Sequence, residues 1–214
     1  MSEGDRRSGT AGSGDQRPSV AGTGDQRPSV AGSGDQRPSV AVVVGSANDL
    51  KRLDEARAVF AWFGVIYEVH VASAHRAPRR VLDLAEEASP RGIRVLIAGA
   101  GKSAALPGVL AAATTLPVIG VPFSSPDLGG LDALLSAVQM PRGVPVATVA
   151  IDGVANAAIL AVEICALGDT RLTRRLGEFK ARLAEGADVM RLLQGDEDRP
   201  AAGSGASAGR EAGR

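Results

Sequence analysis

Residues 40–50 read VAVVVGSANDL, an apolar run followed by a glycine, a serine and an asparagine–aspartate pair. A short, continuous apolar run of this kind suits a strand that is buried on both faces of a parallel sheet. The polar residues after it are typical of a loop that leads into a helix. This stretch therefore predicts the first strand, loop and helix of an α/β fold.

The same alternation continues along the chain. Further short apolar runs predict strands over 65–71, 93–98, 117–121 and 144–151. Apolar residues at helical spacing predict helices over 50–63, 81–88, 106–113, 128–138, 154–167 and 169–190. Repeated strand–helix units predict a parallel sheet with helices on both faces. No strand follows the last helix, so we expect its apolar side to pack on another subunit and the protein to be a homo-oligomer.

The two ends of the chain differ from its middle. The sequence GDQRPSVA begins at Gly14, Gly24 and Gly34, and contains few apolar residues. Such segments cannot bury enough apolar surface to offset the entropy lost on ordering. We therefore expect disordered decapeptide repeats over 1–37, one α/β domain over 38–190, and a second disordered tail over 191–214. The alternative for the repeats is a partner-binding or sorting tail.

Composition excludes several classes of function. Lys plus Arg number 24 and Asp plus Glu number 24, and only 3% of residues are aromatic. This balance argues against a nucleic-acid partner, which needs a basic excess or stacking aromatics. A single cysteine, Cys165, excludes an internal disulfide framework and a cysteine-rich zinc site. With neither a long apolar run nor an apolar leader segment, the sequence predicts a cytoplasmic protein without a membrane partner.

The candidate site residues follow the first two predicted strands, because open parallel sheets bind ligands beyond the carboxyl ends of their strands. Ser46 and Asp49 stand at a predicted helix start, where free N–H groups favour an anion. The alternative is an ordinary helix cap at Asn48 or Asp49. Ser73, His75 and Arg76 follow the second strand and offer a hydroxyl, a proton carrier and a phosphate-binding fork. The alternative for this cluster is a structural role.

The third predicted strand leads into GAGKSAALPG at 99–108. Small residues such as Gly101 and Ser103, with Lys102 between them, allow a planar ligand to approach the backbone closely. The other histidine, His70, lies inside a strand, where we expect it to be packed or edge-exposed. His70 and His75 do not predict a metal site, because the sequence supplies no third ligand.

These segments, together with VQMPRGVPV at 138–146, occur in an order that resembles the N5-carboxyaminoimidazole ribonucleotide mutase family of purine synthesis. The resemblance extends from about Val40 to about Arg182. It implies a flavodoxin-like three-layer sandwich, usually assembled as an octamer. It also implies a ribonucleotide substrate, with CO2 as an intermediate, and neither a metal nor any other cofactor.

The resemblance also implies roles for individual residues. His75 would transfer the proton, Asp49 would bind the ribose hydroxyls, and phosphate would be held by Ser46, Ser73 and Arg76. The loop containing Gly101, Lys102 and Ser103 would face the imidazole. The reaction moves a carboxylate from the exocyclic nitrogen to ring carbon C4, by decarboxylation and recarboxylation.

The sequence departs from the family pattern mainly on the side of the base. Ala105 replaces the second histidine of the glycine-rich loop, Lys102 replaces a glycine, and the segment 150–157 is about two residues shorter. Two alternatives therefore stay open beside the mutase. One is a paralogue that carboxylates or decarboxylates another ribonucleotide or heteroaromatic acid. The other is a non-catalytic nucleotide-binding or assembly protein.

Overall fold

The computed structural model describes residues 37–195, which form one parallel sheet with helices on both faces. The strands are β1 (Val40–Val44), β2 (Tyr67–Val71), β3 (Val95–Ala100), β4 (Val118–Pro122) and β5 (Ala147–Thr148). They lie in the order β2-β1-β3-β4-β5, and every neighbouring pair is parallel. This is the flavodoxin-like strand order, so the predicted fold class is confirmed.

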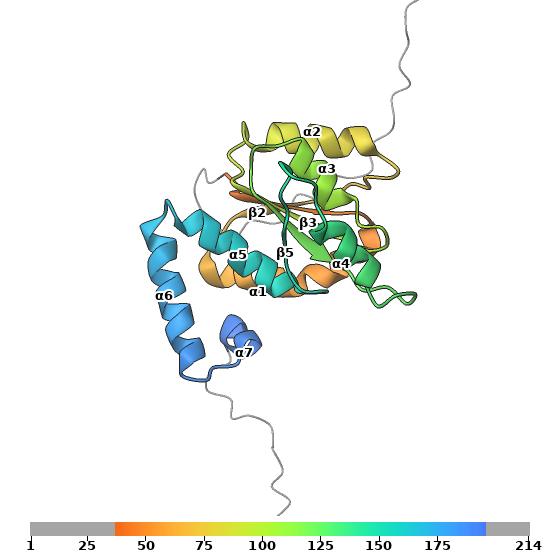
Figure 1. The fold of residues 1–214 in the computed structure, drawn as a ribbon. Helices are drawn as coiled ribbons and strands as arrows, with labels where there is room; N and C mark the ends of the chain where they lie inside the picture. Colours follow the sequence, from red (N-terminus) through yellow and green to blue (C-terminus); the bar gives the residue numbers. More distant parts are fainter. Residues whose placement is uncertain (1–36, 196–214) are drawn as a thin grey trace, which may run out of the picture.

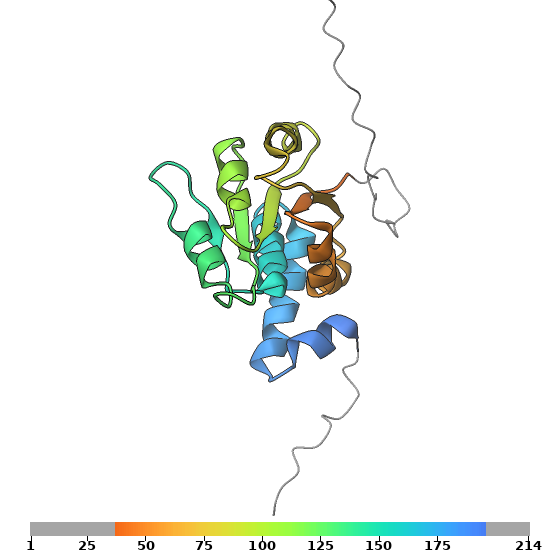
Figure 2. The ribbon, with the colours of Figure 1, turned by 90° about the vertical axis from the view of Figure 1, so that its right-hand side faces the viewer.

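Helices cover both faces of the sheet (Figure 1). The 3-10 helix η1 (Ala47–Leu53) runs into α1 (Asp54–Phe63), which covers one face together with α5 (Val154–Ala166). The other face is covered by α2 (Pro78–Ala88), α3 (Leu106–Ala112) and α4 (Leu131–Val138). Figure 2 shows the same layers from the side. Because proline fits the first turn of a helix, α2 begins at Pro78, three residues before the predicted start.

The core follows from the alternation of side chains along β1. Val40, Val42 and Val44 belong to the cluster that packs on α1 and α5. Ala41 and Val43 point to the opposite face, toward α2 and α3. Burial on both faces explains why this strand is apolar throughout rather than alternating with polar residues.

Strand β5 is shorter than predicted. Of the predicted strand 144–151, only Ala147 and Thr148 pair with β4. Pro145 has no N–H to donate to a ladder, which disfavours pairing at the start of the predicted strand. The chain leaves the sheet after Thr148, and Asp152, whose φ is +57°, forms a tight turn into α5.

The C-terminal region extends further than predicted. The expected helix over 169–190 is two helices, α6 (Thr170–Ala184) and α7 (Val189–Gln194), separated by Gly186 at φ +91°. Leu192 and Leu193 of α7 are 1% and 7% exposed. The prediction of a disordered tail from residue 191 is therefore wrong for 191–194. Residues 196–214 of that predicted tail, and residues 1–36 of the repeats predicted over 1–37, lie outside the described residues.

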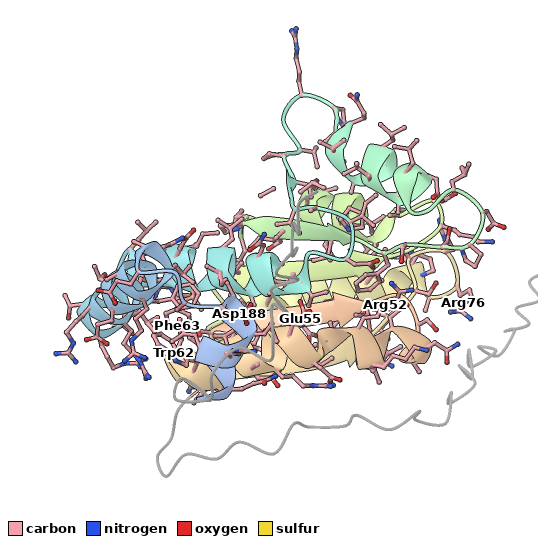
Figure 3. All side chains as sticks on the ribbon, turned by 90° about the horizontal axis from the view of Figure 1, so that it is seen from below. Arg52, Glu55, Trp62, Phe63, Arg76 and Asp188 are labelled. Carbon is pink, nitrogen blue, oxygen red and sulfur yellow. The ribbon has the colours of Figure 1, made fainter. Side chains whose placement is uncertain are left out.

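Helix α6 packs within its own chain, so the expectation that its apolar side needs another subunit is wrong. The ring of Phe179 lies 5.4 Å from the rings of both Trp62 and Phe63 of α1. Leu172 is also buried in this cluster. In Figure 3, Trp62 and Phe63 lie at the opposite end of α1 from Arg52. The C-terminal helices thus extend the core away from the candidate site.

Between residues 37 and 195, no helix combines the length and apolar character needed to cross a membrane.

Candidate functional site

A cavity of about 230 Å³ lies where β1, β2 and β3 end. The order of the sheet reverses between β1 and β3, whose following helices cover opposite faces, so the loops after these two adjacent strands diverge and leave a space between them. Three loops line this space with the following residues: Gly45, Ser46, Asp49, Ser73, Ala74, His75, Ala100, Gly101, Lys102, Ser103, Ala104 and Leu106. Every predicted site residue except Arg76 is among them.

The loop after β1 is organised by Ser46. Its Oγ accepts a hydrogen bond from the backbone N–H of Asn48 at 3.3 Å, which makes Ser46 the cap of η1. The alternative of a cap at Asn48 or Asp49 is therefore wrong, and the Asp49 carboxylate is free to line the cavity. Burial raises the pKa of Asp49, and the charge of Arg52, whose Nε lies 3.8 Å from Oδ1, acts in the opposite direction.

The loop after β2 supplies a hydroxyl and an imidazole. The N–H of Ala77 bonds to the carbonyl of Ser73 at 2.8 Å, which closes a turn around His75. Arg76 does not line the cavity. Its Nη2 donates to the carbonyl of Gly45 at 3.3 Å, so this exposed side chain spans the loops after β1 and β2. In Figure 3, Arg76 lies at the same end of the molecule as Arg52.

The second histidine is structural. His70 Nε2 lies 2.8 Å from Glu68 Oε1, and Glu68 also pairs with Arg91. Burial acts to raise the pKa of Glu68, but the hydrogen bonds and charges of His70 and Arg91 outweigh it, and the pKa is lowered. The side chain of His70 is 10% exposed and lines no part of the cavity. Within residues 37–195, no three His, Cys, Asp or Glu side chains are grouped to hold a metal ion.

The loop after β3 is tied to the region around α4. Ser103 has φ +50°, and its N–H donates to Asp132 Oδ2 at 3.2 Å. The Lys102 ammonium pairs with Asp127, and the hydrogen bond and charge of that carboxylate raise the pKa of the lysine. Ala105, which stands where the family pattern has a histidine, is at the start of α3 and does not line the cavity.

Sequence reasoning missed Arg52, which joins η1 to the loops after β4 and β5 near the cavity. Its Nη1 lies 2.6 Å from Asp152 Oδ1 and 3.3 Å from Ser124 Oγ, and its Nη2 bonds to the Ser124 carbonyl at 3.1 Å. A neighbouring hollow of about 310 Å³ is lined by residues of both charges, Arg52 and Asp152 among them. The only signal in the sequence is that Arg52 follows Asp49 by one helical turn.

Comparison with known proteins adds to this geometry. A family model described as AIR carboxylase matches residues 39–186, which contain all three loops of the cavity. An N5-carboxyaminoimidazole ribonucleotide mutase of Saccharolobus solfataricus is 53% identical over 139 residues, 65% of this chain and 88% of the relative. The Mycobacterium leprae protein of the same name is 49% identical over 158 residues, 74% of this chain and 91% of that protein.

Two solved structures are similar in fold to this chain. The crystal structure of Treponema denticola PurE matches with a TM-score of 0.64 and 27% identity, over 70% of this chain and 93% of that one. A second Treponema denticola structure, of a single-residue variant of PurE2, gives a TM-score of 0.63 at 25% identity, over 75% of this chain and 97% of that one. Since both the sequence match and the sheet order cover the whole α/β domain, the chain belongs to the AIR carboxylase family.

Proposed function

We propose that the protein is an N5-carboxyaminoimidazole ribonucleotide mutase of purine biosynthesis. The observation that carries this proposal is the cavity, where hydroxyls, a carboxylate and an imidazole from three loops face one space. The relatives from Saccharolobus solfataricus and Mycobacterium leprae bear this name. The substrate would be a ribonucleotide whose exocyclic nitrogen carries a carboxylate.

The phosphate group would bind between the loops after β1 and β2. Ser46 Oγ already accepts a hydrogen bond from Asn48, so its own proton is available to a ligand. Ser73 offers a second hydroxyl among the residues that line the cavity. Arg76 is anchored to the Gly45 carbonyl through one nitrogen, and its remaining N–H groups can reach a phosphate oxygen.

The ribose would lie against Asp49 and the base against the loop after β3. A carboxylate is a strong acceptor for hydroxyl donors such as the ribose diol. The backbone at Gly101 is open, since an added Cβ would meet only the Phe123 carbonyl oxygen, 3.9 Å away. A planar imidazole can therefore approach the loop that contains Ser103.

His75 would act as both general acid and general base. Protonated His75 gives its proton to the exocyclic nitrogen as the bond from nitrogen to the carboxylate carbon breaks and CO2 forms. Ring carbon C4 then attacks CO2, and neutral His75 takes the proton that leaves C4. One proton enters and one leaves, so a single histidine returns to its starting state. A positioned acid or base of this kind contributes about 10²–10⁴-fold to the rate.

Incubation of the purified protein with the carbamate ribonucleotide tests the proposal, with formation of the C4 carboxylate as the measured quantity. We expect His75→Asn to lose at least about 100-fold in turnover while it still binds the product in calorimetric titration. His70→Asn is the matched control, because His70 lies outside the cavity, and it should stay within about threefold of the wild type. If the wild type forms no product, the paralogue and the non-catalytic protein become the better hypotheses. If His75→Asn keeps more than about a tenth of the turnover, His75 is not the acid–base group.

We further propose a cytoplasmic homo-oligomer, an octamer by resemblance to the family. Four large apolar side chains form an exposed stripe on and just before α4: Leu128, Leu131, Leu135 and Val138, which are 63%, 51%, 48% and 49% exposed. They are spaced by three or four residues and so share one side of the helix. A net charge of zero leaves little repulsion between copies. This stripe, rather than α6, is the surface through which we expect copies to associate.

A further inference from the structure

We propose that Lys102 binds the carboxylate that migrates during the reaction, and that Asp127 holds the lysine in place when no substrate is bound. This inference rests on the proposed function and assigns a role that the family pattern does not supply, since that pattern has a glycine here. Lys102 is the one lysine or arginine among the residues lining the described cavity. A substrate with two anionic groups can use a second cationic partner besides the phosphate site.

The backbone around Lys102 is held in a fixed position. The next residue, Ser103, adopts φ +50°, a conformation that non-glycine residues rarely occupy. Its N–H is bonded to Asp132 Oδ2 at 3.2 Å, which ties the loop to α4. The stem of Lys102 therefore starts from the cavity wall at a defined point, while its ammonium group can still move.

The present partner of Lys102 is easily exchanged. The side chains of Lys102 and Asp127 are 65% and 61% exposed. Ion pairs between exposed groups contribute little, because water and salt screen them. A substrate carboxylate inside the cavity is screened less and can take the place of Asp127. The lysine thus exchanges one carboxylate for another without a change in its own charge.

The two cations lie on different sides of the proposed binding site, one for each anionic group of the substrate. Arg76 bridges the loops after β1 and β2, where the phosphate is proposed to lie. Lys102 comes from the loop after β3, on the side of the base. Because the ribose and ring separate the phosphate from the carboxylate, one cation can serve each. A single positive charge also stays near the carboxylate carbon while its bond to nitrogen breaks and its bond to C4 forms.

The test compares two ligands that differ only in the carboxylate: the C4-carboxylated product and the unsubstituted aminoimidazole ribonucleotide. Calorimetric titration of Lys102→Met should show binding of the carboxylated ligand weakened by about tenfold or more, with binding of the unsubstituted ligand changed by less than about twofold. Lys102→Arg is the matched control that keeps the charge, and it should retain most of the difference between the ligands. Asp127→Asn removes the competing carboxylate and should strengthen binding of the carboxylated ligand only.

Three outcomes would overturn the inference. Equal weakening of both ligands by Lys102→Met would assign the lysine to the phosphate. No weakening of either would show that Lys102 does not reach the ligand. Loss of the discrimination in Lys102→Arg would show that charge is not the property that matters. Failure of the proposed function is distinct from all three, because in that case the wild type itself would fail to bind either ribonucleotide or to turn over the carbamate.

Discussion

Replacing Arg52 by alanine should weaken substrate binding even though Arg52 is not among the residues lining the cavity. Its guanidinium joins η1 to the loops after β4 and β5, through Asp152 at 2.6 Å and the Ser124 carbonyl at 3.1 Å. The same group lies 3.8 Å from Asp49, the residue proposed to bind the ribose. Arg52 is thus a positioning residue that holds Asp49 against the rest of the site.

The expected size of the effect follows from these contacts. Hydrogen bonds to a charged group contribute about 1.5–3 kcal/mol when buried. Arg52 and Asp152 are 32% and 44% exposed, so solvent screening reduces their contribution to stability to about 1 kcal/mol. A displaced Asp49 would weaken the ribose contact by a similar free energy, which raises KM by about fivefold to tenfold. Because the ribose is remote from the reacting carbon, kcat should change by less than about threefold.

The loss of stability caused by Arg52→Ala should depend on pH, and the two neighbouring carboxylates determine in which direction. Burial raises the pKa of Asp49, and Arg52 opposes that rise, so Arg52→Ala should raise the pKa further. Burial also acts to raise the pKa of Asp152, but bonds from Ser124 and the charge of Arg52 outweigh it and lower the pKa. Asp152 therefore contributes stability above its unfolded pKa, and this stability is lost as the pH falls through its lower folded pKa. Asp49 has the opposite sign, and its ionised form costs stability as the pH rises.

Both carboxylates therefore make Arg52→Ala more destabilising at neutral pH than in acid. The difference from the wild type should shrink as the pH falls, first where Asp49, with its raised pKa, becomes protonated and then below about 4, where Asp152 does. Steady-state kinetics and urea denaturation at several pH values measure the two effects. Arg57→Ala is the matched control, because Arg57 pairs with Asp54 at 2.6 Å on the outer surface of α1. An unchanged KM in Arg52→Ala, or an equal rise in Arg57→Ala, would refute the positioning role.

Three shorter predictions concern other parts of the molecule. Arg76→Ala should raise KM by about tenfold or more with little change in kcat, because a phosphate contact is remote from the reacting ring; an unchanged KM would place the phosphate elsewhere. Leu192→Ala should destabilise the protein by about 2–4 kcal/mol in urea denaturation, while Leu167→Ala, at a residue 88% exposed, should stay within about 0.5 kcal/mol. Leu135→Asp should lower the mass found by light scattering, and an unchanged oligomer would exclude the α4 stripe as the interface.

Much of the fold could be predicted because each strand lies within a short apolar run that is visible in the local sequence. The valine run at 40–44 has no polar residue, which only a strand buried on both faces requires. The errors arise where the outcome depends on distant partners. The division of α6 from α7 is marked by Gly186, but burial of Leu192 depends on a docking position that periodicity does not reveal. Without that position, a short apolar pair near a polar tail looks like part of the tail.

The site residues also fall into two groups, those that a local sequence pattern predicts and those that depend on distant partners. Ser46, Ser73 and His75 directly follow strands, so the rule for parallel sheets is enough to bring them together. The partners that hold the site in place were missed. Arg52 is 72 residues from Ser124 and 100 from Asp152, and no local pattern connects residues so far apart. Asp127 and Asp132 were likewise missed, because each looks like an ordinary polar residue near a helix start.

Introducing a histidine at position 105 should add little to the rate, because the proton balance of the proposed reaction needs only one proton carrier. The nitrogen receives one proton and C4 releases one, so His75 alone can carry out both transfers in sequence. Ala105 lies at the start of α3 and does not line the cavity. An imidazolium there would also be disfavoured by the positive end of the helix dipole. We therefore expect Ala105→His to change kcat by less than about threefold, measured as initial rates at saturating carbamate ribonucleotide. A gain of tenfold or more would show that one histidine is not sufficient, and that a second proton carrier limits the rate in this chain.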